Sequence, residues 1–147
     1  MLGTKKEVKD WLVKSGIKHY TINEDLSVSV EGDVLLASVG LIGLLPVKFR
    51  DVNGHFNCSH NYLTSLDGCP SRVGGHFNCD GNELSLLKGC PEYVGGNCSF
   101  IANKLVESEE FLYNCDVEKI GNYYRSKNLN NKLTKSLVDV QEVVIIR

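Results

Sequence analysis

The sequence predicts an α/β repeat solenoid, in which short parallel strands stack coil upon coil into one continuous face. Two observations lead to this fold class. Two adjoining segments of the chain, which begin at Val52 and Val73, repeat each other over their whole length and share 12 identical positions. Each copy also combines a strand-like alternation with a fixed spacing of asparagine and leucine. The composition, with 42% hydrophobic and 23% charged residues, permits an ordinary globular core.

The first half of each copy separates inward from outward side chains. Phe56 and Cys58 alternate with polar residues, which is the two-residue period of a strand. Phe77 and Cys79 repeat this pattern in the next copy. The residues between them are therefore predicted to point outward, on a face that the curvature of the solenoid makes concave. The predicted outward positions are His55, Asn57, Ser59, His76, Asn78, Asp80, Asn97, Ser99 and Ile101.

An asparagine follows each strand at a fixed distance from two leucines. Asn61 lies two residues before Leu63 and five before Leu66, and the next copy repeats this spacing. It is the leucine-rich-repeat signature, which predicts a right-handed solenoid with repeats of about 21 residues. Asparagine is expected where the chain turns off the sheet, because its amide can pair with backbone groups that would otherwise be buried without partners. The predicted structural ladder consists of Asn61, Asn82 and Asn103.

Less regular copies flank the two clear ones. A third copy begins at Val94 and carries Cys98 and Phe100 in the reverse order. An earlier, degraded copy can be laid over the same register, with extra residues at 46–48 and Gly40 where the asparagine is expected. Its inward positions are predicted to be Leu35, Ala37, Ile42 and Leu45, and its outward positions Val34, Leu36 and Ser38.

A terminal remnant of the repeat is predicted over 120–124, which gives four or five coils in all. Arg125 and Lys127 would then extend the outward face.

Both ends of a stack of coils expose apolar interior, so caps are expected. Thr4 and Glu7 have the spacing of a capping box and predict a cap helix from Lys5 to Ser15, followed by two short strands. A second cap helix is predicted after Ser108, with a further helix over 129–140 and a strand over 143–146. The chain is thus expected to be one domain, with an amino-terminal cap at 1–32, repeats at 33–107 and a carboxy-terminal cap at 108–147.

The repeats resemble two groups of known proteins over about residues 33–105. The segment Leu-Thr-Ser-Leu-Asp-Gly-Cys-Pro at 63–70, followed by Val-Gly-Gly, resembles short leucine-rich-repeat proteins encoded by tailed bacteriophages. Tyr-Thr-Ile-Asn-Glu-Asp-Leu at 20–26 and Leu-Pro-Val-Lys-Phe at 45–49 are similar to phrases of the same family. The spacing is also similar to that of bacterial effector leucine-rich repeats. The resemblance implies a protein that binds, and inhibits, a host bacterial protein such as a defence factor.

The six cysteines and the paired histidines leave alternatives open. No two cysteines stand two to four residues apart, as zinc ligands commonly do, so packing in the core is the preferred interpretation over a disulfide or a metal site. His55 and His76 occupy one outward column, where contact with a partner is preferred over metal binding or joint protonation as a pH sensor. Cys115 lies outside the regular repeat, in a setting that supplies no base. We expect neither metal nor cofactor.

Charge and hydropathy limit the classes of function that the chain can have. The formal net charge of −2 provides no basic surface for nucleic acid, and the longest apolar run, at 34–47, is too short and too interrupted for a membrane span. The first residues carry no apolar signal core, so a cytoplasmic protein is expected. No activated nucleophile or paired catalytic carboxylate indicates an enzyme. The expected function is protein binding through the outward face, with a structural component of a virion as the alternative and an enzyme as a third possibility.

Overall fold

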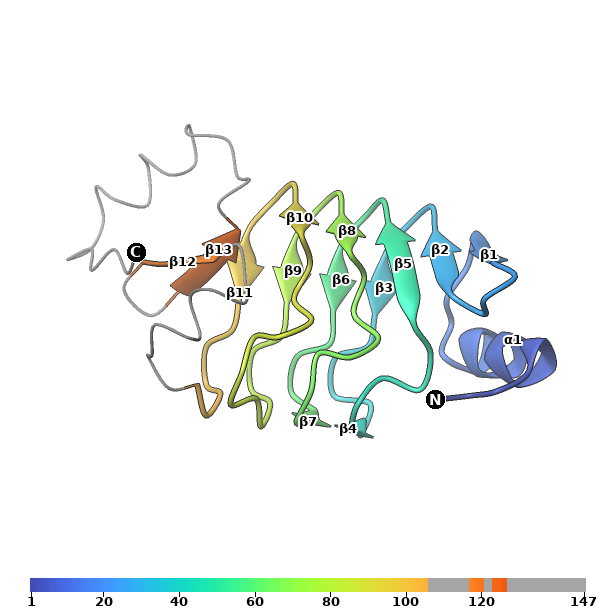
Figure 1. Ribbon diagram of the computed structural model, residues 1–147, viewed down its shortest axis with the longest axis horizontal. Coiled ribbons are helices and arrows are strands. Elements are labelled where there is room, and N and C mark those ends of the chain that lie inside the picture. Colours follow the sequence, from blue (N-terminus) through green and yellow to red (C-terminus); the bar gives the residue numbers. More distant parts are fainter. Residues whose placement is uncertain (106–116, 121–122, 127–147) are drawn as a thin grey trace.

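The computed structural model describes residues 1–105, 117–120 and 123–126. In these residues the chain winds into a β-solenoid, whose short strands stack along the long axis with a helix at the amino-terminal end (Figure 1). The strands of successive coils pair in parallel, so that each coil repeats the path of the one before it. The coils make about three turns, fewer than the four or five expected.

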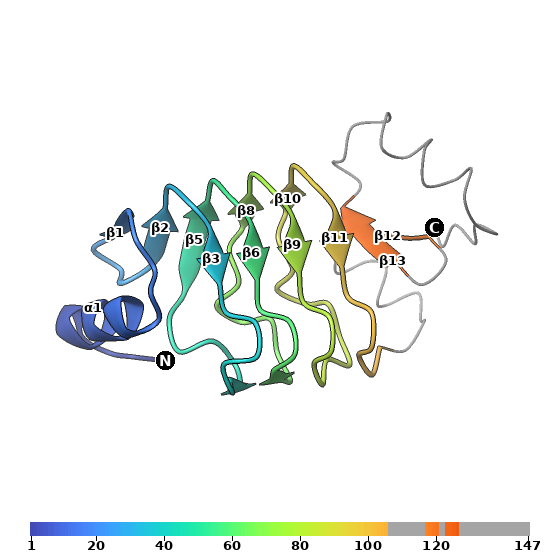
Figure 2. The same cartoon turned by 180° about the vertical axis from the view of Figure 1, so that it is seen from behind.

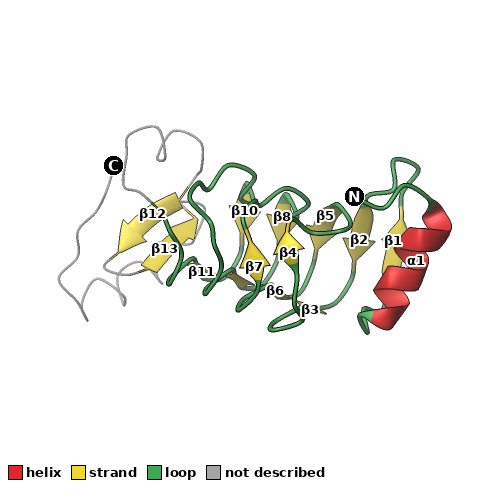
Figure 3. Ribbon diagram, turned by 90° about the horizontal axis from the view of Figure 1, so that it is seen from below, coloured by secondary structure: helices red, strands yellow, loops and turns green. Residues whose placement is uncertain are grey.

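Two main sheets form the walls of the solenoid, and the helix is α1 (Lys5–Lys14). The five-stranded sheet has the order β1 (Tyr20–Ile22), β2 (Val28–Val30), β5 (Phe49–Val52), β8 (Arg72–Val73), β10 (Tyr93–Val94). The four-stranded sheet has the order β11 (Cys98–Ser99), β9 (Phe77–Asn78), β6 (Phe56–Asn57), β3 (Val34–Leu35). A small third sheet joins β4 (Ile42–Gly43) to β7 (Tyr62–Leu63) along the turns of the coils (Figure 3).

The amino-terminal helix forms where the sequence predicts it. The Glu7 backbone N–H donates to Thr4 Oγ1 at 3.2 Å, and the Thr4 backbone N–H donates to the Glu7 carboxylate at 3.1 Å. These reciprocal bonds satisfy groups that the first turn of a helix leaves unpaired. Val8 and Leu12 are buried in the same core as the coils. The two strands predicted after the helix are β1 and β2, which pair antiparallel.

A column of phenylalanine rings fills the centre of the solenoid. The ring centroids of Phe56 and Phe77 lie 5.5 Å apart with their planes inclined by 8°, and the centroid of Phe100 lies 5.4 Å from that of Phe77. Cys98 pairs with Phe77 in the sheet and is buried, so the reversed order in the third copy keeps both side chains inside. Burial of each ring contributes about 1.5 to 3 kcal/mol through the hydrophobic effect.

The first coil departs from the predicted register by one residue. Val34 pairs with Phe56, and Phe56 pairs with Phe77, so the first coil is one residue longer than the second. Because side chains alternate along a strand, this one residue exchanges the two faces. Val34 and Leu36, predicted to point outward, are 0% and 1% exposed, whereas Leu35, predicted to point inward, is 62% exposed. The predicted orientation of this strand was therefore wrong.

The turn of the first coil departs from the predicted register in the opposite direction, because Gly43, and not Ile42, pairs with Leu63. Ala37 and Ile42, predicted to point inward, are exposed, whereas Leu45 is buried as predicted. The strand of this coil and its turn follow different registers, so no single residue takes the place of the ladder asparagine. The N–H groups of Val39 and Leu41, on either side of Gly40, both donate to Asn61 Oδ1 of the next coil. The first coil thus turns without an asparagine of its own.

Glycine pairs open the second and third regular copies because successive coils approach closely there. A Cβ at Gly74 or Gly95 would clash with a backbone carbonyl of the preceding coil. A Cβ at Gly75 or Gly96 would clash with a histidine ring of the preceding coil. The absence of side chains at these positions lets each coil settle onto the one before it.

The carboxy-terminal strands of the described chain do not continue the parallel stack. β12 (Val117–Ile120) and β13 (Tyr123–Ser126) pair antiparallel in a sheet of their own. The repeat remnant predicted over 120–124 was wrong, because a further coil would pair in parallel. Several predictions fall outside the described residues or side chains, namely the helices after Ser108 and over 129–140, the strand over 143–146, and the roles of Cys115, Arg125 and Lys127.

Candidate binding face on the parallel strands

The strands β3, β6, β9 and β11 of the four-stranded sheet follow one another along the solenoid axis (Figure 2). Their outward positions form three rows along this axis. We call this surface the strand face. Each row takes one residue from each coil, because the strands pair in register. The first row is Asp33, His55, His76 and Asn97, the second is Leu35, Asn57, Asn78 and Ser99, and the third is Ala37, Ser59, Asp80 and Ile101.

Most of the residues predicted to point outward are accessible on the strand face. The exposed ones are His55, His76 and Asn97, and the partly exposed ones are Asn57, Asn78, Asp80, Ser99 and Ile101. Ser59 is only 4% exposed, so its predicted exposure was wrong. The Ser59 N–H donates to Asn57 Oδ1 at 3.0 Å, and the Ser59 carbonyl accepts from the Ser38 N–H at 3.0 Å. The chain already turns inward at this point.

Side chains of the first row accept hydrogen bonds from the backbone of the following coil. Asp33 Oδ1 accepts from the His55 N–H at 2.7 Å, and His55 Nδ1 accepts from the His76 N–H at 2.8 Å. His76 Nδ1 in turn accepts from the Asn97 N–H at 2.8 Å. The two imidazole rings lie 4.8 Å apart with their planes inclined by only 6°. Asp33, His55 and His76 thus have the same structural role, because each accepts a backbone hydrogen bond from the next coil.

The asparagines of the second row bond within their own coil. Asn57 Oδ1 accepts from the Ser59 N–H at 3.0 Å, and Asn78 Oδ1 accepts from the Asp80 N–H at 2.9 Å. Asparagine commonly bonds to the backbone two residues ahead in this way, which orients its amide. Leu35 places an apolar side chain in the same row of the first coil.

Asp80 joins the third and fourth strands of the strand face. Its Oδ1 accepts from the Ser99 hydroxyl at 2.6 Å and from the Ile101 N–H at 2.8 Å. This carboxylate oxygen is therefore engaged in holding coils together, as that of Asp33 is at the other end of the face.

The ladder asparagines lie at the turns where the coils leave the strand face. Asn82 Oδ1 accepts from the Leu63 N–H at 3.0 Å. Asn82 Nδ2 donates to the carbonyls of Cys58 and Cys79 at 3.0 and 3.2 Å. Asn103 makes the corresponding bonds one coil later. Each amide thereby bridges two coils and pairs backbone groups inside the solenoid.

Asn61 ends the ladder on the amino-terminal side. Its Oδ1 accepts from two N–H groups of the first coil, those of Val39 and Leu41, at 3.1 and 3.0 Å. Its Nδ2 donates to the Leu36 carbonyl at 2.8 Å. One asparagine therefore serves both its own coil and a coil that lacks one.

Cysteines fill the core behind the strand face. The Sγ atoms of Cys58 and Cys79, both buried thiols, lie 3.2 Å apart within hydrogen-bond reach. The hydrogen bond with Cys69, followed by burial, raises the pKa of Cys58, and the hydrogen bond with Cys58, followed by burial, raises the pKa of Cys79. Thiols held in their protonated form are poor nucleophiles.

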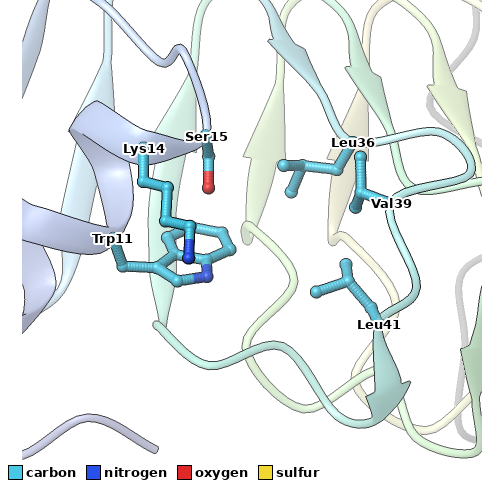
Figure 4. A pocket seen from close by; sticks show the side chains of 6 residues that line it. All are labelled: Trp11, Lys14, Ser15, Leu36, Val39 and Leu41. Atoms are coloured by element: carbon cyan, nitrogen blue, oxygen red, sulfur yellow. The ribbon is translucent and has the colours of Figure 1, made fainter.

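A pocket of about 370 Å³ lies between the end of α1 and the first coil (Figure 4). Its lining consists of Trp11, Lys14, Ser15, Leu36, Val39 and Leu41. The picture shows two helix residues and Ser15, which follows the helix, on one side, facing the three coil residues on the other. The lining is mostly apolar and contributes one ionisable group, Lys14, which alone makes no acid–base pair.

Sequence reasoning missed two features of the site. The first is the role of His55 and His76 as hydrogen-bond acceptors. The glycine pairs that precede His76 and Asn97 could have indicated it, because they show that the next coil passes close to each histidine ring. The second is apolar exposure in the first and second coils. Leu35 shows it on the strand face, and Ile42 and Tyr62 pair across β4 and β7 with 78% and 60% exposure.

Within residues 1–105 and the two short strands beyond them, no group of three or more histidine, cysteine or acidic side chains is placed to hold a metal ion. Over the same residues, no helix has the length and apolarity required to cross a bilayer. The chain matches no family model, no curated protein and no solved structure.

Proposed function

We propose that this chain is a leucine-rich-repeat module that binds a protein partner on the strand face, with α1 serving as its amino-terminal cap. The observation that carries the proposal is the fixed orientation of four side chains in the first two rows, His55, His76, Asn57 and Asn78, each of which is hydrogen-bonded to the backbone. A surface ordered before binding loses little side-chain entropy when a partner docks. Repeat scaffolds also tolerate variation at outward positions, which is where binding residues arise.

The resemblance to repeat proteins of tailed bacteriophages supports the second part of the proposal. The partner is a host bacterial protein, such as a defence factor, that the chain binds and inhibits in the host cytoplasm. The alternative, a virion component, requires the chain to be present in purified particles, which mass spectrometry of the particles tests directly.

The test of the strand face is a double substitution, His76→Glu with Asn78→Glu. Glu at position 76 introduces a carboxylate that can accept a backbone N–H, as that of Asp33 does in the first coil. Position 78 is partly exposed, so the melting midpoint should stay within a few degrees. Affinity for a protein captured from host lysate should fall by about 1 to 2 kcal/mol or more.

The matched control introduces the same kind of charge at Ser71, an exposed residue that precedes β8 in the other sheet. Ser71→Glu should leave binding unchanged. Retained binding by the double variant, together with loss of binding by Ser71→Glu, would show that the partner docks elsewhere.

A further inference from the structure

We infer that the centre of the strand face is a surface of hydrogen-bond donors, and that its partner binds it through carboxylate side chains. The inference rests on the proposed function and adds the chemistry of the partner. It concerns four residues, His55, Asn57, His76 and Asn78, which we call the donor cluster.

The backbone bonds of the first row determine which imidazole nitrogen carries the proton. Nδ1 of His55 and Nδ1 of His76 each accept a backbone N–H at 2.8 Å, so each must present a lone pair. A neutral imidazole has one donor and one acceptor nitrogen, and the proton is therefore on Nε2 in both rings. The near-parallel rings direct these two Nε2–H groups the same way, one coil apart.

The second row is oriented by the same logic. The Oδ1 atoms of Asn57 and Asn78 accept backbone N–H groups of their own strands. Their NH₂ groups are left as the outer, donating ends of the amides. Among the described residues, these NH₂ groups and Nε2 of the two histidines make no hydrogen bond.

Acceptors on the strand face are used differently from donors. Asp33 Oδ1 accepts from the His55 backbone, and Asp80 Oδ1 accepts from Ser99 and Ile101. One oxygen of each of these two carboxylates is thus used to hold the next coil, whereas the donors of the donor cluster make no bond to their own coils. A complementary surface must bring acceptors.

Carboxylates are the acceptors that fit best. Hydrogen bonds to an ionised acceptor are roughly twice as strong as neutral ones, and a carboxylate has two oxygens that can accept from donors on adjacent coils. The rings of adjacent coils lie 4.8 Å apart, a separation that one carboxylate can bridge. A nucleic acid is disfavoured, because phosphate recognition needs cationic side chains and this cluster contains none.

The tautomer is tested first, on the full ¹⁵N-labelled chain at neutral pH. Long-range ¹H–¹⁵N correlation spectra should show Nε2–H and an acceptor Nδ1 for both His55 and His76. A proton on Nδ1 of either ring would overturn the inference, because that ring could not accept the backbone bond and present Nε2–H.

Ligand chemistry is tested by titration with acetyl-hexaglutamate amide, monitored on the side-chain NH₂ signals of Asn57 and Asn78. The decisive variant is Asn57→Asp with Asn78→Asp. Aspartate keeps the oxygen that accepts the Ser59 and Asp80 N–H groups and exchanges only the outward donor for an acceptor. The variant should bind hexaglutamate at least about tenfold more weakly. Ser71→Asp with Ser85→Asp adds the same charge at exposed positions outside the three rows and should bind as the wild type does.

Acetyl-hexaglutamine amide and acetyl-hexalysine amide complete the comparison. The inference predicts weaker binding for the first and no shift of the asparagine signals for the second. It is overturned if hexalysine binds more tightly than hexaglutamate, or if hexaglutamate leaves the asparagine signals unmoved. If that happens while His76→Glu with Asn78→Glu still loses the protein partner, the proposed function stands and only the carboxylate chemistry fails.

Discussion

The first and second coils share one core, yet their surfaces are built differently. The second coil turns at a buried asparagine, Asn61, and carries a histidine that accepts a bond from the next coil. The first coil is one residue longer, has Val39 at the turn and exposes Leu35 on the strand face. Val34 nevertheless pairs with Phe56 and continues the central column. The inward column therefore stays continuous although the two surfaces differ, and the asparagine of a neighbouring coil serves a coil that has none.

The largest expected effect tests the register of the first coil with two neighbouring substitutions. Val34→Asp places a carboxylate at a fully buried position and should cost more than about 4 kcal/mol, or abolish the cooperative transition. Leu35→Asp places the same group on the exposed side and should change the free energy of unfolding by less than about 1 kcal/mol. Chemical denaturation measures both. Equal effects would show that the shift of one residue is misplaced.

The next effect concerns the asparagine ladder of the regular coils. Asn82→Ala should cost about 1 to 3 kcal/mol, because the Leu63 N–H and the carbonyls of Cys58 and Cys79 lose a buried partner. Asn97→Ala, at an exposed position of the strand face, is the control in the same denaturation assay. If the two midpoints shift equally, the ladder bonds do not stabilise the solenoid.

A smaller effect tests whether the two kinds of coil use interchangeable acceptors. His76→Ala should cost about 1 kcal/mol by leaving the Asn97 N–H without its partner. His76→Asp should recover much of that loss, since Asp33 accepts the equivalent N–H in the first coil. Thermal melts of the two variants measure the difference. An aspartate variant less stable than the alanine variant would contradict the equivalence of the row positions.

The smallest effect on stability at neutral pH comes from the buried thiols Cys58 and Cys79. The first coil has Leu36 at the corresponding position. The folded-state pKa of Cys58 and Cys79 is raised, whereas an unfolded thiol titrates near about 8.5. Below that pH both states keep their protons and stability is unaffected. As pH rises further, the unfolded state loses protons first, so stability should fall.

Denaturation midpoints measured from neutral to alkaline pH test this dependence. Cys58→Ala with Cys79→Ala should flatten the alkaline decline. A decline of the same steepness in the variant would assign it to other groups.

The sequence predicted the regular coils well because each position occurs twice in one register. Phe56 and Phe77 each lie between two polar residues, so the alternation in their strands allows only one assignment of inward and outward positions. In the first coil Val34, Leu35 and Leu36 are all apolar, and three consecutive apolar residues leave the phase of the strand undetermined. The one-residue insertion then reversed the faces.

The sequence predicted which residues lie on the candidate site but not which hydrogen bonds their side chains make. Outward residues such as His76 and Asn78 follow from alternation within one strand. The acceptor role of Nδ1 depends on where the next coil places its backbone N–H, which is a contact with a distant part of the sequence. Burial of Ser59 likewise depends on a turn that begins with the Asn57 side chain. Neither follows from local pattern.

The most direct test of the central claim maps the partner onto the chain. In a cross-saturation experiment, a captured unlabelled partner is irradiated and the loss of signal is recorded on the deuterated, ¹⁵N-labelled chain. The strongest losses should fall on the backbone and side-chain signals of His55, Asn57, His76 and Asn78. Losses confined to Trp11, Val39 and Leu41 around the pocket, or to residues beyond 105, with the strand face unaffected, would contradict it.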